Sequence, residues 1–405
     1  MKIISIHILF LLLLVTNSLA QDAWIQVDSL NGPPRANAVS FIIGDEGYIT
    51  TGYDGSSKKR SMVSYDYQQD DWDNELSLGG TTGDGLNRSS AISFTAWGYG
   101  FVGLGEGTGF MFTDLWMYDK YTDSWTQMAN FPGGARAQAI SFCIDNIGYV
   151  GLGKLSDLAT FANDLWAYDF LTNNWSQKSD FPGTARIDAI GETLGAKGYV
   201  GLGHDSNGYP NDFYEYDPQT DNWDQKADFP GSPRSNAATL GIFPQLLVIT
   251  GGDAFNYFND CWEYNYFGDV WIQRADFPGG SRSGACAFVV DGRAFAGTGY
   301  SDGQYFDDWY EYGFQLGTSE LIQLNISIFP NPATTNFQID LSKTEKKINI
   351  SIYNCIGQDV SAQFSQEIQD NVYQLNCNDI VSGQYFIIVS EEDKLLTTYP
   401  LIVSR

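Results

Sequence analysis

Short apolar segments separated by turn residues repeat along most of the chain. In each unit an arginine precedes a first segment such as ANAVSFII or AQAISFCI, and a second segment ends in glycine, as in GYITTG or GYVGLG. A third segment such as DLWMYD and a fourth such as NWSQKSD complete the unit, and DKYTDS or DPQTDN joins them. Aromatic and β-branched runs between clusters of turn residues are typical of β-strands. The pattern therefore predicts units of four strands each.

The spacing inside the units is regular. A glycine follows the arginine after 17 residues, a tyrosine follows after 13 more (15 in the third unit), and a tryptophan stands seven further on in five units. The arginines, glycines, tyrosines and tryptophans are Arg35, Arg88, Arg136, Arg186, Arg234, Arg282; Gly52, Gly105, Gly153, Gly203, Gly251, Gly299; Tyr65, Tyr118, Tyr168, Tyr216, Tyr264, Tyr312; and Trp72, Trp125, Trp175, Trp223, Trp271. A unit of about 50 residues has the length of one four-stranded propeller blade. We predict an all-β fold with a six-bladed β-propeller over residues 21–316, in which the tryptophans pack the blades.

The N-terminal segment indicates how such a ring would close. The sixth unit stops after DDWYEYGFQLG, and Ser319 stands where its tryptophan would be. Trp24 lies eleven residues before Arg35, the spacing found in every other unit except the second, where it is sixteen. We therefore predict that the strand around Trp24 completes the sixth blade and leaves few exposed edges.

On these residues the six units resemble kelch repeats. The glycine-ended second strand, the tyrosine and the tryptophan carry the resemblance, whereas the usual Gly-Gly doublet stands only at Gly251 and Gly252. The resemblance implies a kelch-type β-propeller. It also implies that arginines at this place contribute to ligand binding, as in better-known kelch proteins.

The two ends of the chain predict export. Residues 1–20 have a basic start, an apolar stretch and small residues before a cleavage point, the layout of a secretory signal peptide. After a linker at 317–322, residues 323–405 alternate apolar and polar positions as a small, Ig-like β-sandwich does. No later segment is long and apolar enough to span a membrane.

The C-terminal segment resembles the C-terminal sorting domain of type IX secretion cargo. Its three motifs, in order, are Pro330, Asn331 and Pro332; Ile356, Gly357 and Val360; and Ser382, Gly383 and Tyr385. The resemblance implies a Bacteroidetes-type Gram-negative host, passage through the periplasm, and a mature protein that is secreted or held on the outer cell surface. The partner it implies is the type IX secretion machinery. The alternative is an accessory domain without a sorting role.

Charge and cysteine content exclude several classes. With 49 acidic and 22 basic residues the net charge is −27, which argues against nucleic acid and anionic membranes as partners. Five scattered cysteines do not make a disulfide framework, although Cys355 and Cys377 could pair. No CxxC occurs, and we expect neither a metal nor a cofactor.

We assign no catalytic residue. A G-x-S-x-G stretch at 299–303 follows a second strand rather than joining a strand to a helix, so two turn glycines explain it better than a nucleophile elbow. A single histidine after the leader, His204, cannot build the copper centre of the galactose-oxidase relatives. A kelch sugar mutarotase or epimerase of the sialic-acid type stays open as an alternative, and so does a purely structural adhesin.

The predicted topology places a candidate ligand site on one face of the ring. The connections into the first strand and out of the second fall on the same side, so the six arginines should ring the opening there. Positions two residues beyond the arginines vary: Asn37, Ser90, Gln138, Asp188, Asn236 and Gly284. The loop of the first unit carries Lys58, Lys59 and Arg60 and could attract an anionic ligand. The candidates for a carbohydrate or protein ligand are thus Arg35, Arg88, Arg136, Arg186, Arg234, Arg282, Asn37, Gln138, Asp188, Asn236, Lys58 and Lys59.

Each candidate has a structural alternative. An arginine in every unit can hold the ring together by binding backbone or carboxylate groups between blades, and guanidinium forks suit both roles. A basic loop can simply be solvated.

Overall fold

The computed structural model describes residues 23–83, 85–313, 327–341, 348–354, 358–369, 372–391 and 394–404. The predicted signal peptide at 1–20, the linker at 317–322 and Cys355 lie outside these ranges. Within them, strands dominate and the helical elements are short 3₁₀ turns. The all-β prediction is therefore confirmed.

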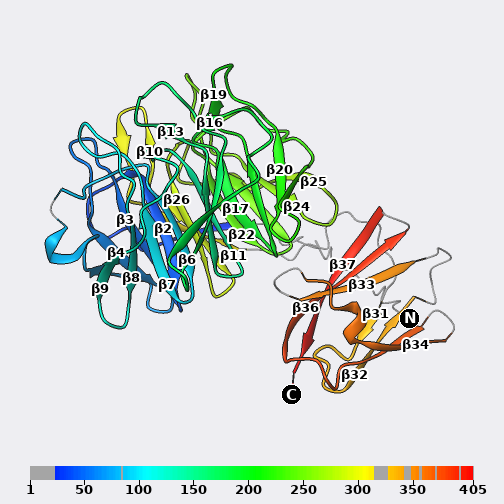
Figure 1. The fold of residues 1–405 in the computed structure, drawn as a ribbon. Helices are drawn as coiled ribbons and strands as arrows, with labels where there is room; N and C mark the ends of the chain where they lie inside the picture. The colour runs from blue at the N-terminus through cyan, green and yellow to red at the C-terminus, as the bar shows by residue number, and fades with distance from the viewer. Residues whose placement is uncertain are drawn as a thin grey trace, which may run out of the picture.

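Residues 23–313 form six four-stranded antiparallel sheets, which we number 1 to 6 (Figure 1). Sheet 1 contains β2 (Ala36–Ile43), β3 (Glu46–Tyr53), β4 (Met62–Asp66) and β5 (Asp71–Glu75); sheet 2, β6 (Ile92–Ala96), β7 (Tyr99–Gly103), β8 (Leu115–Asp119) and β9 (Ser124–Gln127); sheet 3, β11 (Ile140–Ile144), β12 (Ile147–Gly151), β14 (Leu165–Asp169) and β15 (Asn174–Lys178). Sheet 4 contains β17 (Ile190–Leu194), β18 (Lys197–Gly201), β20 (Phe213–Asp217) and β21 (Asn222–Gln225); sheet 5, β22 (Ala238–Ile242), β23 (Gln245–Ile249), β24 (Cys261–Asn265) and β25 (Val270–Arg274); sheet 6, β26 (Cys286–Val290), β27 (Arg293–Gly297), β30 (Trp309–Gly313) and β1 (Ala23–Val27).

Smaller elements connect these sheets. They are the two-stranded pairs β10 (Arg136–Ala137) with β13 (Lys154–Leu155), β16 (Arg186–Ile187) with β19 (His204–Asp205), and β28 (Tyr300–Ser301) with β29 (Gln304–Tyr305), and the 3₁₀ turn η1 (Gly80–Thr82). The segment AQAISFCI, predicted as one strand, is divided between β10 and β11. Its break lies where Gln138 takes a left-handed backbone conformation, φ 59°.

The first strands of the six sheets lie next to one another in chain order: β2, β6, β11, β17, β22 and β26, with β26 again beside β2. Phenylalanines fill the layers between the sheets, and glycines make room for them. A Cβ at Gly148, for example, would lie 2.4 Å from the ring of Phe94 in sheet 2. Because interiors are close-packed, no larger side chain fits at such a position.

The repeated tryptophans link each sheet to its neighbour. Each is paired across the strands with the repeated tyrosine of the same sheet, and the indole N–H donates to a carbonyl of the preceding sheet at 2.8–3.1 Å. Trp24 follows the same rule, since it pairs with Tyr312 and donates to the carbonyl of Ala275 at 3.1 Å. Strand β1 is thus the fourth strand of sheet 6, as the tryptophan spacing predicts.

The C-terminal part consists of two further sheets. One contains β31 (Ser327–Phe329), β32 (Asn336–Asp340), β35 (Val372–Asn376) and β34 (Ser365–Gln369); the other contains β33 (Asn349–Asn354), β36 (Gly383–Glu391) and β37 (Lys394–Val403), and η2 (Ser361–Gln363) lies between β33 and β34. Residues such as Phe337, Ile387 and Leu401 form a common buried core. Phe386 also contacts Phe243 of the connection after β22, with ring centroids 5.6 Å apart.

Candidate functional site

Five of the six repeated arginines are buried in ion pairs. Their side chains bind the aspartate just before the third strand of their own sheet with both carboxylate oxygens, and the NH2 to Oδ2 distances are 2.8–2.9 Å. The pairs, which we call the arginine layer, are Arg88 with Asp114, Arg136 with Asp164, Arg186 with Asp212, Arg234 with Asp260 and Arg282 with Asp308. The arginines are 0–1% exposed. Bidentate pairs of this kind are strong and specific in direction.

The arginine layer also stabilises a strained backbone. The residue before each repeated glycine has a left-handed φ of 55–61° in sheets 2 to 6, although it is leucine or threonine. Its carbonyl accepts a hydrogen bond from the NH1 group of the arginine at 2.8–3.0 Å. Such a conformation costs a side-chain-bearing residue roughly 1–2 kcal/mol, and the buried guanidinium offsets part of this cost.

The contacts of these arginines are thus architectural, as the structural alternative predicts, but they lie within one sheet rather than between blades. A ligand on the open face meets other residues before it meets these buried side chains, and their contribution to binding stays a prediction. Arg35 differs from the other five, because Ser61 stands where they have an aspartate.

The residues two positions beyond the arginines form a closed ring, which we call the throat. All six have a left-handed φ between 50° and 66°. The N–H of each donates to the carbonyl of the preceding member at 2.8–3.1 Å, and the first donates to the last. The members are Asn37, Ser90, Gln138, Asp188, Asn236 and Gly284. Five of them line a cavity of about 100 Å³.

Side-chain hydrogen bonds join members of the throat to one another. Gln138 donates to Asp188 at 2.5 Å, and Asn236 donates to the Oδ1 atom of Asn37 at 2.7 Å. The second bond passes Gly284, where a Cβ would lie 2.3 Å from the same oxygen. The absence of a side chain at Gly284 therefore leaves room for the hydrogen bond between Asn236 and Asn37.

Asp188 is the acidic group of the throat. Burial raises the pKa of its carboxyl to about 7, although the hydrogen bond from Gln138 and the charge of Lys154 favour the ionised form. A carboxyl that titrates near neutrality can carry a proton at working pH. Such a group marks a functional site more often than a random surface aspartate does.

A second ring surrounds the throat, and we call it the rim. It consists of the residues that follow the repeated glycines: Tyr53, Glu106, Lys154, His204, Gly252 and Tyr300. Each pairs with the residue just before a throat residue, as His204 does with Ile187 and Lys154 with Ala137. The rim therefore lies directly beside the throat on the same face.

The rim extends into aromatic clusters on the neighbouring loops. Tyr305 lies between Tyr53 and Tyr300, with ring centroids at 5.8 and 4.9 Å. His204 lies 4.8 Å from Tyr209. The sequence analysis did not identify the rim. Its residues also vary between repeats at a fixed spacing, which is the same signal that identified the throat.

The basic loop of sheet 1 lies outside the rim. Lys58 binds the Glu106 carboxylate and the carbonyl of Gly107, both at 2.7 Å. Lys59 binds Asp54 and donates to Ser57. Both ammonium groups are thus engaged in local ion pairs, and their role in attracting an anionic ligand stays a prediction.

Beyond the throat, the first strands enclose a larger channel of about 500 Å³. Its hydroxyl groups bind neighbouring sheets: Ser93 donates to the carbonyl of Ser40 at 2.7 Å and Ser141 donates to that of Ser93 at 2.8 Å. Burial raises the pKa of Glu192 in this channel, where the Thr193 N–H and the Thr239 hydroxyl bind its carboxylate. These contacts hold the first strands together.

Two further findings concern metal ions and membranes. In the part of the chain that the structure describes, no cluster of three or more His, Cys, Asp or Glu side chains is arranged to hold a metal ion. The same residues include no helix with the length and apolar character needed to cross a membrane.

Comparison with known proteins supports the C-terminal sorting domain and the propeller-like fold of the body. Residues 327–404 match the family model of the secretion system C-terminal sorting domain, which confirms the predicted sorting domain. This domain implies export by the type IX machinery, to the cell surface or beyond. A solved structure titled "Structure of YjhT" matches with a TM-score of 0.60 and 17% identity, over 69% of this chain and 95% of that one. The likeness concerns the fold alone and supports a propeller-like body. No curated protein matches the sequence.

Proposed function

We propose that this protein is a six-bladed, kelch-type β-propeller that type IX secretion presents on the cell surface or releases, and that it binds a carbohydrate or protein ligand at the throat and rim. Six sheets with neighbouring first strands support the blade count. The pairing of β1 with β30 and the closed hydrogen-bonded ring of the throat support closure. A Bacteroidetes-type host fits the sorting domain.

The observation that carries the proposal is the chemistry of the open face. Asn37, Gln138, Asp188 and Asn236 present amide and carboxylate groups around one cavity. Such groups both donate and accept hydrogen bonds, as sugar hydroxyls require. The tyrosines of the rim add flat apolar faces with a polar end, the usual complement of such polar groups in a ligand site. This geometry therefore favours the terminal sugar of a carbohydrate chain over a peptide as the ligand.

A glycan array with the purified protein tests this assignment. Replacing either Gln138 or Asn236 with alanine should reduce binding about fivefold or more, because each change removes a hydrogen bond worth about 1 kcal/mol. Gln219→Ala, at an exposed turn between β20 and β21, is the matched control. Equal binding by all three variants would contradict a ligand site at the throat.

The export proposal has its own test. A chain without residues 323–405 should stay in the periplasm, while the full chain reaches the outside. Fractionation with antibodies against the body measures this. Unchanged export of the shortened chain would overturn the role of the sorting domain.

Asp188 favours a second candidate, a sugar mutarotase of the kelch type. Its pKa of about 7 suits general acid–base catalysis, and His204 and Lys154 of the rim are titratable neighbours. NMR exchange between sugar anomers, lost in Asp188→Asn, would support catalysis. Exchange at the uncatalysed rate with sialic acid and with neutral hexoses would leave the binding module as the function.

A further inference from the structure

Sheet 1 lacks the carboxylate that binds the arginine in the other sheets, although the carbonyls of Pro33 and Thr51 keep the usual contacts with Arg35. Ser61 occupies the place of the aspartates, and Val63 that of Trp116, whose indole binds Asp114. Lys59 occupies the place of Phe112, whose ring lies 3.6 Å from the Arg88 guanidinium carbon. The backbone confirms the correspondence, since Lys59 and Phe112 both donate to the repeated glycine of their unit.

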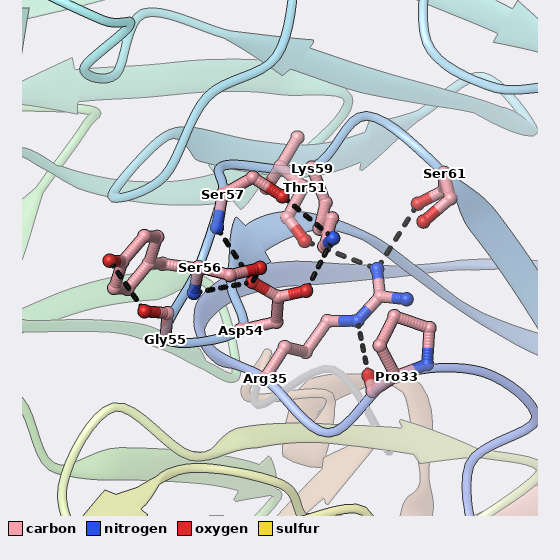
Figure 2. A network of polar contacts seen from close by, with 10 residues as sticks. Pro33, Arg35, Thr51, Asp54, Gly55, Ser56, Ser57, Lys59 and Ser61 are labelled. Atoms are coloured by element: carbon pink, nitrogen blue, oxygen red, sulfur yellow. Dashed lines mark hydrogen bonds and ion pairs between the residues drawn. The ribbon is translucent and has the colours of Figure 1, made fainter. Parts of the chain in front are cut away.

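Arg35 is nevertheless as buried as the others, at 1% exposure. Its Nε donates to the carbonyl of Pro33 at 3.3 Å, and its NH1 donates to those of Thr51 at 3.2 Å and Ser61 at 3.3 Å. Figure 2 shows these contacts and the Asp54 carboxylate turned toward Lys59 and the loop backbone. Among residues 23–83 and 85–313, no acidic side chain binds Arg35 and no aromatic ring lies over it.

Two hydroxyl groups beside Arg35 are also buried without a hydrogen-bond partner among the described residues. They are the Oγ1 of Thr51 and the Oγ of Ser61. The carbonyls of these two residues accept from the same NH1 atom of Arg35. The Oγ1 of Thr250, at the position of Thr51 in sheet 5, is also unpartnered, so the Ser61 hydroxyl is the one peculiar to sheet 1. Buried polar groups are nearly always hydrogen-bonded in folded proteins.

An isolated buried cation is costly. Burial lowers the pKa of Arg35, against weaker opposing effects of Cys286 and Asp54. The cost is large enough that buried charges are normally paired. The five other arginines show what pairs them: two oxygens of one carboxylate.

We propose that Arg35, Ser61 and Thr51 form a binding site for a small monovalent anion, a halide or a simple carboxylate, which takes the part that aspartate plays in the other five sheets. Guanidinium and hydroxyl donors are the groups that bind such anions. The site is separate from the throat and does not depend on the proposed ligand.

The position of Arg35 gives the anion a structural role. Its carbonyl accepts from the N–H of Gly299 in the sheet 6 unit at 2.8 Å, and Leu30 donates to Asp307 of that unit at 2.7 Å. The segment between β1 and β2 therefore lies along the seam between sheets 6 and 1. A bound anion stabilises this seam, where the two ends of the propeller-like body meet.

Thermal unfolding of the full chain in sodium chloride, acetate and gluconate at equal ionic strength tests the proposal. Chloride or acetate should raise the midpoint by roughly 2–4 °C in a saturable manner, as expected near 100 times the dissociation constant. Gluconate, the bulkiest of the three anions, serves as the reference. Amide exchange of residues 23–27 should slow with the same anion dependence, and identical midpoints in the three salts would overturn the proposal.

Two reciprocal variants sharpen the test. Ser61→Asp supplies the carboxylate within the chain and should abolish the chloride and acetate effect, whereas Asp114→Ser should create a similar effect at Arg88. Should Ser61→Asp fail to fold, Ser61→Ala, which removes one donor, should weaken the anion effect at least threefold. Bromide soaked into crystals should give an anomalous peak beside Arg35. Absence of this peak would contradict the site, and so would an undiminished anion effect in Ser61→Asp.

Discussion

The arginines of the layer and the throat residues stand two positions apart in sheets 2 to 6, yet they differ in almost every property. The layer is uniform in sequence, buried and paired with carboxylates of the same sheet. The throat has one backbone conformation but five residue types, and five of its six members line a cavity. Uniform positions carry the architecture, and variable positions on the same frame are available for recognition.

The largest expected effect comes from breaking the layer. Arg234→Ala leaves Asp260 half-buried without its partner and removes the hydrogen bond to the strained Thr250. Removing one member of a buried pair costs about 3–5 kcal/mol. Chemical denaturation should show this loss, and the double variant Arg234→Ala with Asp260→Ala should recover part of it. A loss below about 1 kcal/mol would contradict an architectural role.

The sequence predicted the layer's position but not the direction of its side chains. Spacing placed each arginine at the start of a first strand, but in sheets 2 to 6 that strand begins four residues after the arginine, as β6 does at Ile92. The aspartate 26 residues later, 28 in the third unit, was the missed signal for burial. Spacing alone cannot show that two residues so far apart meet, because the loop between them decides the approach.

Removing the tryptophan that joins β1 to sheet 6 should have the next largest effect. Trp24→Ala loses ring contacts with Phe277 at 5.1 Å and Tyr312 at 4.9 Å, together with the bond to Ala275. We expect a loss of about 2–4 kcal/mol, measured by denaturation. Trp24→Phe keeps most of the packing and is the control. Sequence spacing alone identified this residue, because its partners are set by the repeat.

The throat should respond to pH through Asp188. Asp188 has a folded pKa of about 7, above its ordinary value, so ionisation opposes folding and stability falls between about pH 4 and 7. Asp188→Asn should therefore stabilise the protein at pH 8, by up to about 4 kcal/mol, and change little at pH 4. The exposed Asp224→Asn is the control. Equal effects at both pH values would show that Asp188 does not titrate as its surroundings indicate.

The smallest effect tests the ring geometry itself. Ser90 and Gly284 share the left-handed conformation, with φ 51° and 66°. Gly284→Ala should destabilise by about 1 kcal/mol, since alanine is strained there and its Cβ displaces Asn37. Ser90→Gly should instead stabilise by about 0.5 kcal/mol, because relief of strain slightly exceeds the entropy gained by the unfolded chain.

Opposite changes in stability at Ser90 and Gly284 would separate the effect of backbone conformation from that of side-chain chemistry in the throat. If both variants bind the same glycans as the parent, the left-handed ring is architecture and only the amide and carboxylate side chains select the ligand. If Gly284→Ala loses binding while its stability changes little, the bond between Asn236 and Asn37 is itself part of the recognition surface. In that case the separation between architecture and recognition would no longer follow the boundary between layer and throat, because the backbone ring that holds the variable residues would also contribute to their specificity.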